Sequence, residues 1–171
     1  MILYHGSNVA IHQIDLSRCR PYKDFGKGFY LTTIEAQAVA MANRTTRIQG
    51  AGSPIVTIFD LDDGWRESGL NILEFSHPSR EWAEFVVNNR DRQFEDLSSL
   101  HCNRLNQYDI VCGPVADDAI VASFQLYQDG RISIDELVER LRFRKLSDQL
   151  SFHTPAALQL LTQVEVHHDR Y

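Results

Sequence analysis

The stretches LYHGS at residues 3–7 and DFGKGFYLTT at residues 24–33 decide how this chain is interpreted. Each combines apolar residues typical of a strand with polar or aromatic side chains, and its glycines free the backbone. The first stretch supplies His5 and the second supplies Tyr30. A His-Gly-Ser strand, a loop and then Gly-x-Gly-aromatic-Tyr-x-Thr form a composite pattern that is more specific than any of its parts.

The composition of the 171 residues predicts one domain over residues 1–171, because 43% hydrophobic content is enough to bury a single core. The formal net charge of −6 argues against non-specific nucleic-acid binding through a broad basic face, since such affinity comes from neutralising phosphates. A local basic groove remains compatible with this charge.

The cysteines are few, odd in number and widely spaced: Cys19, Cys102 and Cys112. They form neither a disulfide framework nor a zinc-binding pair, so they favour a reducing cytoplasm. We interpret Cys112 as a buried strand residue rather than a reactive thiol. The chain has no basic region followed by an apolar stretch at its start and no run of about 18 apolar residues, so we expect a cytoplasmic protein without a membrane span.

Short apolar runs separated by amphipathic segments predict an α+β fold. The predicted strands cover residues 1–5, 29–32, 55–59, 71–75, 108–112, 149–152 and 164–167. Thr33 is predicted to cap a helix whose packed side includes Ala36, Val39, Ala40 and Ile48. Further helices are expected at residues 79–90, 117–127, 133–143, where Ser133 and Glu136 have capping-box spacing, and 155–161.

The reacting end of NAD, a nicotinamide ring joined to a ribose, fits the groups that the two stretches supply. Breaking this bond develops positive charge on the sugar, so an enzyme must hold the ribose, the carboxamide and the leaving ring in place. His5 can bond a ribose hydroxyl as a neutral imidazole, and the Tyr30 ring can stack on nicotinamide. We expect both rings to line one dinucleotide site. In the same interpretation, the Gly6 backbone bonds the carboxamide, and the Ser7 and Thr32 hydroxyls help to orient the nicotinamide ribose. Each of these residues alone also fits a structural role.

Most of the chain resembles a bacterial family, DUF3990, grouped with the ADP-ribosyltransferases. The resemblance rests on residues 23–33, 81–90 (EWAEFVVNNR), 108–118 (YDIVCGPVADD) and 149–154 (QLSFHT). Within that superfamily the His and Tyr motifs are similar to those of diphtheria toxin and the poly(ADP-ribose) polymerases. The resemblance implies a split half-barrel of two antiparallel sheets with surrounding helices around an NAD cleft. It also implies a toxin-type role and a small antitoxin protein as partner.

The chain departs from those relatives at the late strand, where they place a catalytic Glu. The matching strand has Gln149, which can hold a ribose but has no charge, and ionic hydrogen bonds are roughly twice as strong as neutral ones. Glu84 is the main candidate to lend a carboxylate, with a solvated helix-face acid as the alternative. Three acids near Gly113 and Pro114 fit helix capping and turns better: Asp109, Asp117 and Asp118.

Four cations in the loop between the two stretches suit the pyrophosphate of NAD, although a solvated surface is an equal alternative: Arg18, Arg20, Lys23 and Lys27. Gly28 joins the NAD-binding residues through the composite pattern. Asn88, Asn89 and Arg90 predict a structural polar network. A second basic run fits a helix surface or a partner contact: Arg140, Arg142, Arg144 and Lys145. His167 and His168 have no further ligands, so we expect no metal site.

The sequence thus predicts a mono-ADP-ribosyltransferase that uses NAD as substrate, needs no metal, and modifies a protein or nucleic-acid acceptor. The expected catalytic residues are His5, Tyr30, Gln149 and Glu84. Two alternatives remain open. One is an NAD glycohydrolase, in which water replaces the acceptor. The other is a domain of this fold that binds a nucleotide or a partner without turnover.

Overall fold

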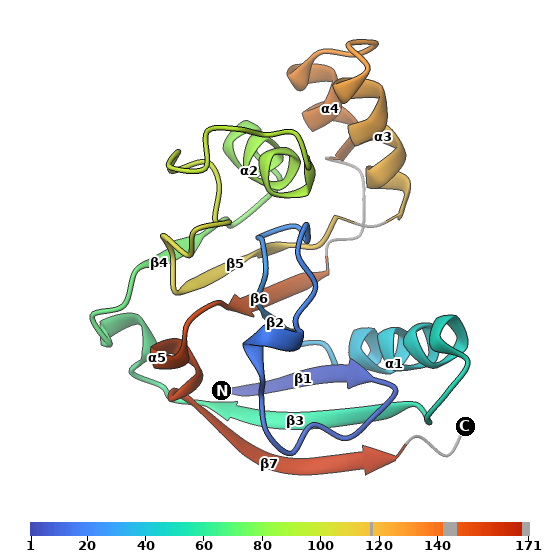
Figure 1. The fold of residues 1–171 in the computed structure, drawn as a ribbon, viewed down its shortest axis with the longest axis vertical. Coiled ribbons are helices and arrows are strands. Elements are labelled where there is room, and N and C mark those ends of the chain that lie inside the picture. The colour runs from blue at the N-terminus through green and yellow to red at the C-terminus, as the bar shows by residue number, and fades with distance from the viewer. Residues whose placement is uncertain (117, 142–146, 169–171) are drawn as a thin grey trace.

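The protein is described by a computed structural model that covers residues 1–116, 118–141 and 147–168 (Figure 1). Two sheets and several helices make up the fold, which confirms the α+β class. The first sheet has the order β1-β3-β7, and its strands are β1 (Ile2–Ser7), β3 (Ile55–Leu61) and β7 (Leu161–His168). The second has the order β2-β6-β5-β4, and its strands are β2 (Phe29–Leu31), β6 (Asp148–Phe152), β5 (Ile110–Pro114) and β4 (Ile72–Glu74).

The second sheet is mixed, which corrects the expectation of two antiparallel sheets. Strand β4 runs parallel to β5, whereas β5 pairs with β6, and β6 with β2, in antiparallel register. Parallel strands require a long crossover. Here the crossover contains α2 (Arg80–Arg90) and the segment that follows it, residues 91–109.

The two sheets are linked where β1 meets β2. The amide of Tyr4 donates to the carbonyl of Thr32 at 2.8 Å, and the amide of Thr32 donates back at 3.0 Å. An apolar core fills the space between the sheets, with members from both. Its fully buried residues include Leu3 and Leu61 of the first sheet and Ile110 and Phe152 of the second.

Helix α1 (Glu35–Gln49) lies against β1 and β3, but its start and its packed side differ from the prediction. Thr33 does not cap it, because the N-cap is Ile34 and the Thr33 hydroxyl donates to Asp148 instead. The buried residues are Ala38 and Ala42, whereas three of the residues predicted to pack are exposed: Ala36, Ala40 and Ile48. Because α1 is rich in alanine, several faces of the helix could pack against the sheet equally well.

Helix α2 and the pair α3 (Asp118–Gln128) and α4 (Ile134–Leu141) cover the other face of the second sheet, far from β7 (Figure 1). Ser79 caps α2 by accepting from the amide of Trp82. The predicted capping box also forms: the Ser133 amide donates to Glu136 at 2.8 Å and the Glu136 amide donates to the Ser133 hydroxyl at 3.1 Å. The predicted end of that helix, residues 142–143, lies outside the described residues.

Three short helices complete the described chain: the 3-10 turns η1 (Leu16–Arg18) and η2 (Trp65–Glu67) and the helix α5 (Pro155–Leu158). The predicted helix over residues 155–161 is therefore too long, because Leu161 already pairs with Leu61 in β7. None of the helices in the described ranges combines the length and apolar character needed to cross a bilayer.

Candidate functional site

Two of the predicted catalytic residues, Tyr30 and Gln149, lie on one face of β2 and β6. Tyr30 pairs with Ser151 in the antiparallel register, so their side chains leave the sheet on the same side. Gln149 lies two residues before Ser151 and shares that face. The intervening residues Leu150 and Phe152 point into the apolar core between the sheets.

Tyr30 holds the glycine loop that precedes it. Its hydroxyl donates to the carbonyl of Gly26 at 2.8 Å and accepts from the amide of Phe25 at 3.0 Å. Gly26 has φ of +90°, a conformation that favours glycine, so the loop can turn back on the ring. Burial first, and then the negative charge of Asp24, raise the pKa of Tyr30 well above its ordinary value, so the phenol stays protonated.

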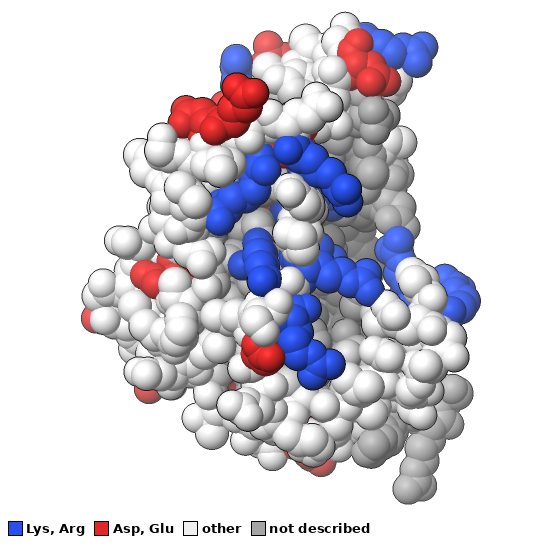
Figure 2. Space-filling model, viewed as in Figure 1, with Lys and Arg blue, Asp and Glu red and all other residues white. Residues whose placement is uncertain are grey.

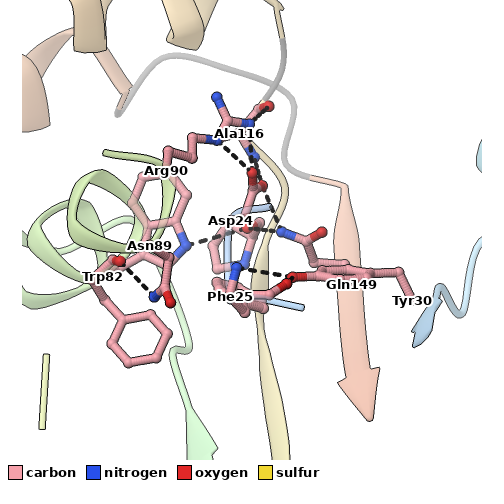
Figure 3. Close-up of polar contacts among 11 residues, drawn as sticks. Asp24, Phe25, Tyr30, Trp82, Asn89, Arg90, Ala116 and Gln149 are labelled. Carbon is pink, nitrogen blue, oxygen red and sulfur yellow. Dashed lines mark hydrogen bonds and ion pairs between the residues drawn. The ribbon is translucent and has the colours of Figure 1, made fainter. Parts of the chain in front are cut away.

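A buried carboxylate, Asp24, lies beside Tyr30 and organises its surroundings (Figure 3). It accepts from Nε of Arg90 at 2.8 Å, from the backbone amide of Ala116 at 3.0 Å and from Nε2 of Gln149 at 2.8 Å. We call Asp24, Arg90, Gln149 and the Ala116 amide the Asp24 network. Three segments distant in sequence thus converge on one acid that is only 6% exposed.

The amide of Gln149 has a second acceptor, the carbonyl of Pro114, at 3.2 Å. The indole N–H of Trp82 donates to the same carbonyl, also at 3.2 Å. These contacts tie the end of β5 to α2 and β6. The predicted late-strand residue is therefore held in one orientation rather than left free.

Glu84 does not take part in these contacts. Its carboxylate pairs with Arg80, one turn earlier on the same helix, at 2.9 Å. Asp109 accepts from the Thr154 hydroxyl and from the Asn71 amide, so it joins distant segments rather than capping a helix or closing a turn. Asp117 lies outside the described residues. The carboxylate that contacts Gln149 is Asp24, which no motif in the sequence indicated.

The basic loop residues contribute to a cluster of positive charge that we call the Lys23 cluster: Arg20, Lys23, Arg44 and Arg90. Burial lowers the pKa of Lys23, the charge of Asp24 opposes this, and the charges of the three arginines lower it further. These cations come from the loop, from α1 and from α2. Figure 2 shows Lys and Arg side chains gathered around a hollow of this face, where Figure 1 places the loop between β1 and β2.

Two other predicted phosphate ligands lie near Asp15, and two further arginines lie near Tyr22, the residue before Lys23. The charges of Arg18 and Lys27 help to lower the pKa of Asp15, after its bonds from Ser17. Arg92 and Arg104 lie over the exposed Tyr22 ring, at 5.1 and 5.5 Å from its centre. Arg44 and Arg90 come from helices, so a loop-based prediction could not include them.

The His5 imidazole contacts the backbone of Tyr30 rather than its ring. Nδ1 lies 2.8 Å from the Tyr30 carbonyl, and because a carbonyl only accepts, Nδ1 must hold the proton. Burial lowers the pKa of His5, so the ring is neutral and Nε2 remains an acceptor. The ring stacks on Phe29 at 4.4 Å, whereas the Tyr30 ring lies against Phe25. The two rings thus occupy different sides of β2, unlike the expected shared site.

Among the remaining predicted NAD ligands, Gly6 and Gly28 have packing roles. A Cβ at Gly6 would lie 1.9 Å from the Ala38 carbonyl oxygen, so Gly6 allows α1 to approach β1. A Cβ at Gly28 would lie 2.7 Å from Nδ1 of His153. The Thr32 hydroxyl donates to Asp148 at 2.6 Å. Ser7 pairs with Ile55 at the end of β1.

The polar network predicted at residues 88–90 is confirmed. Asn89 is fully buried, donates to the carbonyl of Phe85 at 2.8 Å and accepts from the amide of Asn103 at 2.9 Å. Asn88 donates to the carbonyl of His101, and Arg90 belongs to the Asp24 network. The segment thereby anchors the long loop after α2.

A cavity of about 340 Å³ has lining residues from around both sheets, among them Trp65, Cys112 and Gln149. Burial raises the pKa of Cys112 to about 12, so its thiol stays protonated, as expected for a structural cysteine. Within the described ranges, no group of three His, Cys, Asp or Glu side chains could hold a metal ion. The second basic run lies outside the described residues from Arg142 onward.

The chain belongs to the family described as Protein of unknown function (DUF3990), whose model matches residues 1–163. A comparison with curated proteins gives no match, and neither does a comparison with solved structures. The family match covers β1 through the start of β7 and therefore includes every residue of the Asp24 network and the Lys23 cluster.

Proposed function

We propose that the protein is a mono-ADP-ribosyltransferase that binds NAD over β2 and β6 and transfers ADP-ribose to a protein or nucleic-acid acceptor. The observation that supports this most is the Lys23 cluster beside the Asp24 network. A chain of net charge −6 gathers four cations from three segments at one place. Burial lowers the pKa of Lys23, the charge of Asp24 raises it, and repulsion from the three arginines lowers it. A bound pyrophosphate would relieve that repulsion, because guanidinium groups bind phosphate oxygens well.

The chemistry assigned to this site is a displacement at the ribose carbon that bears nicotinamide. The bond from C1′ to the ring nitrogen breaks, and its electron pair leaves with neutral nicotinamide. An oxygen or nitrogen of the acceptor then bonds to C1′ and loses its proton. Gln149 would accept from a ribose hydroxyl, whereas the neutral His5 ring lies on the other side of β2 and would act on the site only through the Tyr30 backbone that it holds.

The direct test is to incubate the protein with NAD labelled in its adenylate part, together with cell extract as a source of acceptors. Label that becomes attached to protein or nucleic acid supports transfer. Release of free ADP-ribose alone would instead indicate an NAD glycohydrolase. Absence of both products from the folded wild-type protein would contradict the proposal.

A matched pair of variants tests the role of the cations. Lys23→Gln removes the central charge of the Lys23 cluster and should raise the KM for NAD about tenfold to a hundredfold, because hydrogen bonds to charged groups contribute about 1.5–3 kcal/mol. Arg131→Gln, at an exposed position between α3 and α4, is the control and should leave KM unchanged. Equal KM values for the two variants would remove the Lys23 cluster from the NAD site.

One observation favours a second candidate, a domain that binds NAD without cleaving it. The late-strand position has Gln149, an uncharged residue. Its amide nitrogen donates to Asp24 and to the Pro114 carbonyl. A positive charge on ribose would meet no full negative charge from this side chain. Tight NAD binding without nicotinamide release, even at high protein concentration, would establish this candidate.

A toxin-type role is the part of the proposal that rests on the family resemblance alone. Expression of the wild-type protein in bacteria should then arrest growth, and a small antitoxin should relieve the arrest. Gln149→Ala is the matched variant, because it removes the proposed ribose contact. Equal growth of cells with either protein would speak against a toxin.

A further inference from the structure

The orientation of the Gln149 amide is fixed by its two partners. Both are acceptors without a hydrogen to donate: the Asp24 carboxylate at 2.8 Å and the Pro114 carbonyl at 3.2 Å. Nε2 must therefore face them, since an amide oxygen in that place would meet only oxygens. The amide oxygen points away from Asp24 (Figure 3), and no described residue donates a hydrogen bond to it.

We propose that Asp24 is a positioning residue that presents the Gln149 amide oxygen as an acceptor for a hydroxyl of the nicotinamide ribose. This inference rests on the proposed function and specifies what Asp24 adds to it. A carboxylate in this place would have oxygens that accept in either orientation. A Gln can accept a hydrogen bond from the ribose hydroxyl only if its amide oxygen faces the ligand. Asp24 fixes this orientation by accepting from the amide nitrogen.

Asp24 also strengthens the acceptor that it positions. A hydrogen bond from Nε2 to a carboxylate polarises the amide, and hydrogen bonds in a chain strengthen one another. Electron density therefore shifts toward the amide oxygen. Arg90 binds the other oxygen of Asp24, and the Ala116 amide shares Oδ2 with Gln149, so both hold Asp24 in place.

Swapping the two side chains separates positioning from mere packing. Asp24→Asn can still offer an oxygen to Arg90, but its amide nitrogen then replaces Oδ2, the oxygen that accepts from both Ala116 and Gln149. This nitrogen favours the flipped Gln149 amide, with nitrogen toward the ligand. We expect kcat/KM for NAD to fall about tenfold to a hundredfold, as when a charged hydrogen bond is lost. Gln149→Glu places two carboxylates in contact and should also lower kcat/KM.

The double variant Asp24→Asn with Gln149→Glu should recover kcat/KM above both single variants, because the new amide donates to the new carboxylate and an oxygen again faces the ligand. A purely structural network predicts no such rescue. The matched control is Asp109→Asn, a carboxylate that also holds two segments together, through Thr154 and Asn71, but does not contact Gln149.

A second readout does not depend on turnover. In NMR spectra, the Gln149 side-chain amide protons should be shifted by Asp24, and adding ADP-ribose should perturb them in wild-type protein but not in Asp24→Asn. Failure of the proposed function would appear in the wild-type protein as lack of NAD cleavage. Failure of this inference would appear in the variants: Asp24→Asn with kcat/KM within about twofold of Asp109→Asn, or the same response to ADP-ribose as wild type.

Discussion

The two faces of the four-stranded sheet are built from alternating residues of the same strands, yet they bury different chemistry. On the face toward the first sheet, Phe29, Leu150 and Phe152 pack into an apolar core. On the face toward α2, Tyr30 and Gln149 join a buried carboxylate and an arginine. Apolar burial stabilises without preference for direction, whereas hydrogen bonds fix orientation.

This difference indicates a division of roles between the faces. Burying charges is costly, and a buried ion pair adds little net stability compared with apolar residues of similar volume. The apolar face therefore supplies the free energy that lets the Asp24 network exist. The network in turn gives Gln149 and Tyr30 defined positions, which a binding site requires and a core does not.

The largest expected effect comes from the apolar face. Phe152→Ala removes a side chain with no exposed surface and should lower the free energy of unfolding by about 3–5 kcal/mol. Urea denaturation measures this change. The change in the free energy of unfolding should depend little on salt. A decrease of less than about 1 kcal/mol would contradict the role assigned to this core.

Arg90→Met breaks the charged pair on the other face. Asp24 would be left buried without its cation, which costs about 3–5 kcal/mol when both groups are fully buried. Because the Arg90 side chain is 25% exposed, we expect about 2–4 kcal/mol in urea denaturation. An unchanged free energy of unfolding would mean that water replaces Arg90 as the partner of Asp24. The two faces of the sheet would then differ less than proposed.

The stability of the polar face should also depend on pH through His153. Burial lowers its pKa from 6.5 to about 4, while the bond to the Lys27 carbonyl opposes this. The unfolded chain therefore binds the proton more tightly. Stability is complete above pH 6.5 and is lost as the pH falls toward 4.

The expected loss between about pH 7.5 and pH 5 is about 2 kcal/mol, measured by urea denaturation at both values. His153→Gln should remove this part of the pH dependence. If the variant shows the same loss as wild type, other groups are responsible for it.

The smallest effect is expected at an exposed pair of the same chemistry. Glu74 accepts from Nε and a terminal nitrogen of Arg66 at 2.9 and 2.8 Å, but both side chains are about half exposed. Glu74→Gln should change the free energy of unfolding by less than about 1 kcal/mol. A larger loss would show that burial does not distinguish this pair from the Asp24 network.

Local structure followed closely from sequence pattern. Each of the seven predicted strands overlaps an observed strand, and the capping box at Ser133 and Glu136 forms as predicted. The predictions were wrong where the local sequence is compatible with several structures. Thr33 could cap a helix but instead binds Asp148, more than a hundred residues away. The alanine-rich α1 could pack several faces, and Gly6 selects Ala38 and Ala42.

The sequence by itself determined the α+β class, the positions of the strands and the family, because periodicity and motifs are local properties. It also singled out Tyr30 and Gln149, which share one face of the four-stranded sheet. Tertiary structure alone decided that β4 runs parallel to β5, that His5 holds the Tyr30 backbone, and that Asp24 meets Arg90 and Gln149. Those contacts join residues 25 to 125 positions apart. No spacing rule encodes them, since they arise only when the packed strands bring their side chains together.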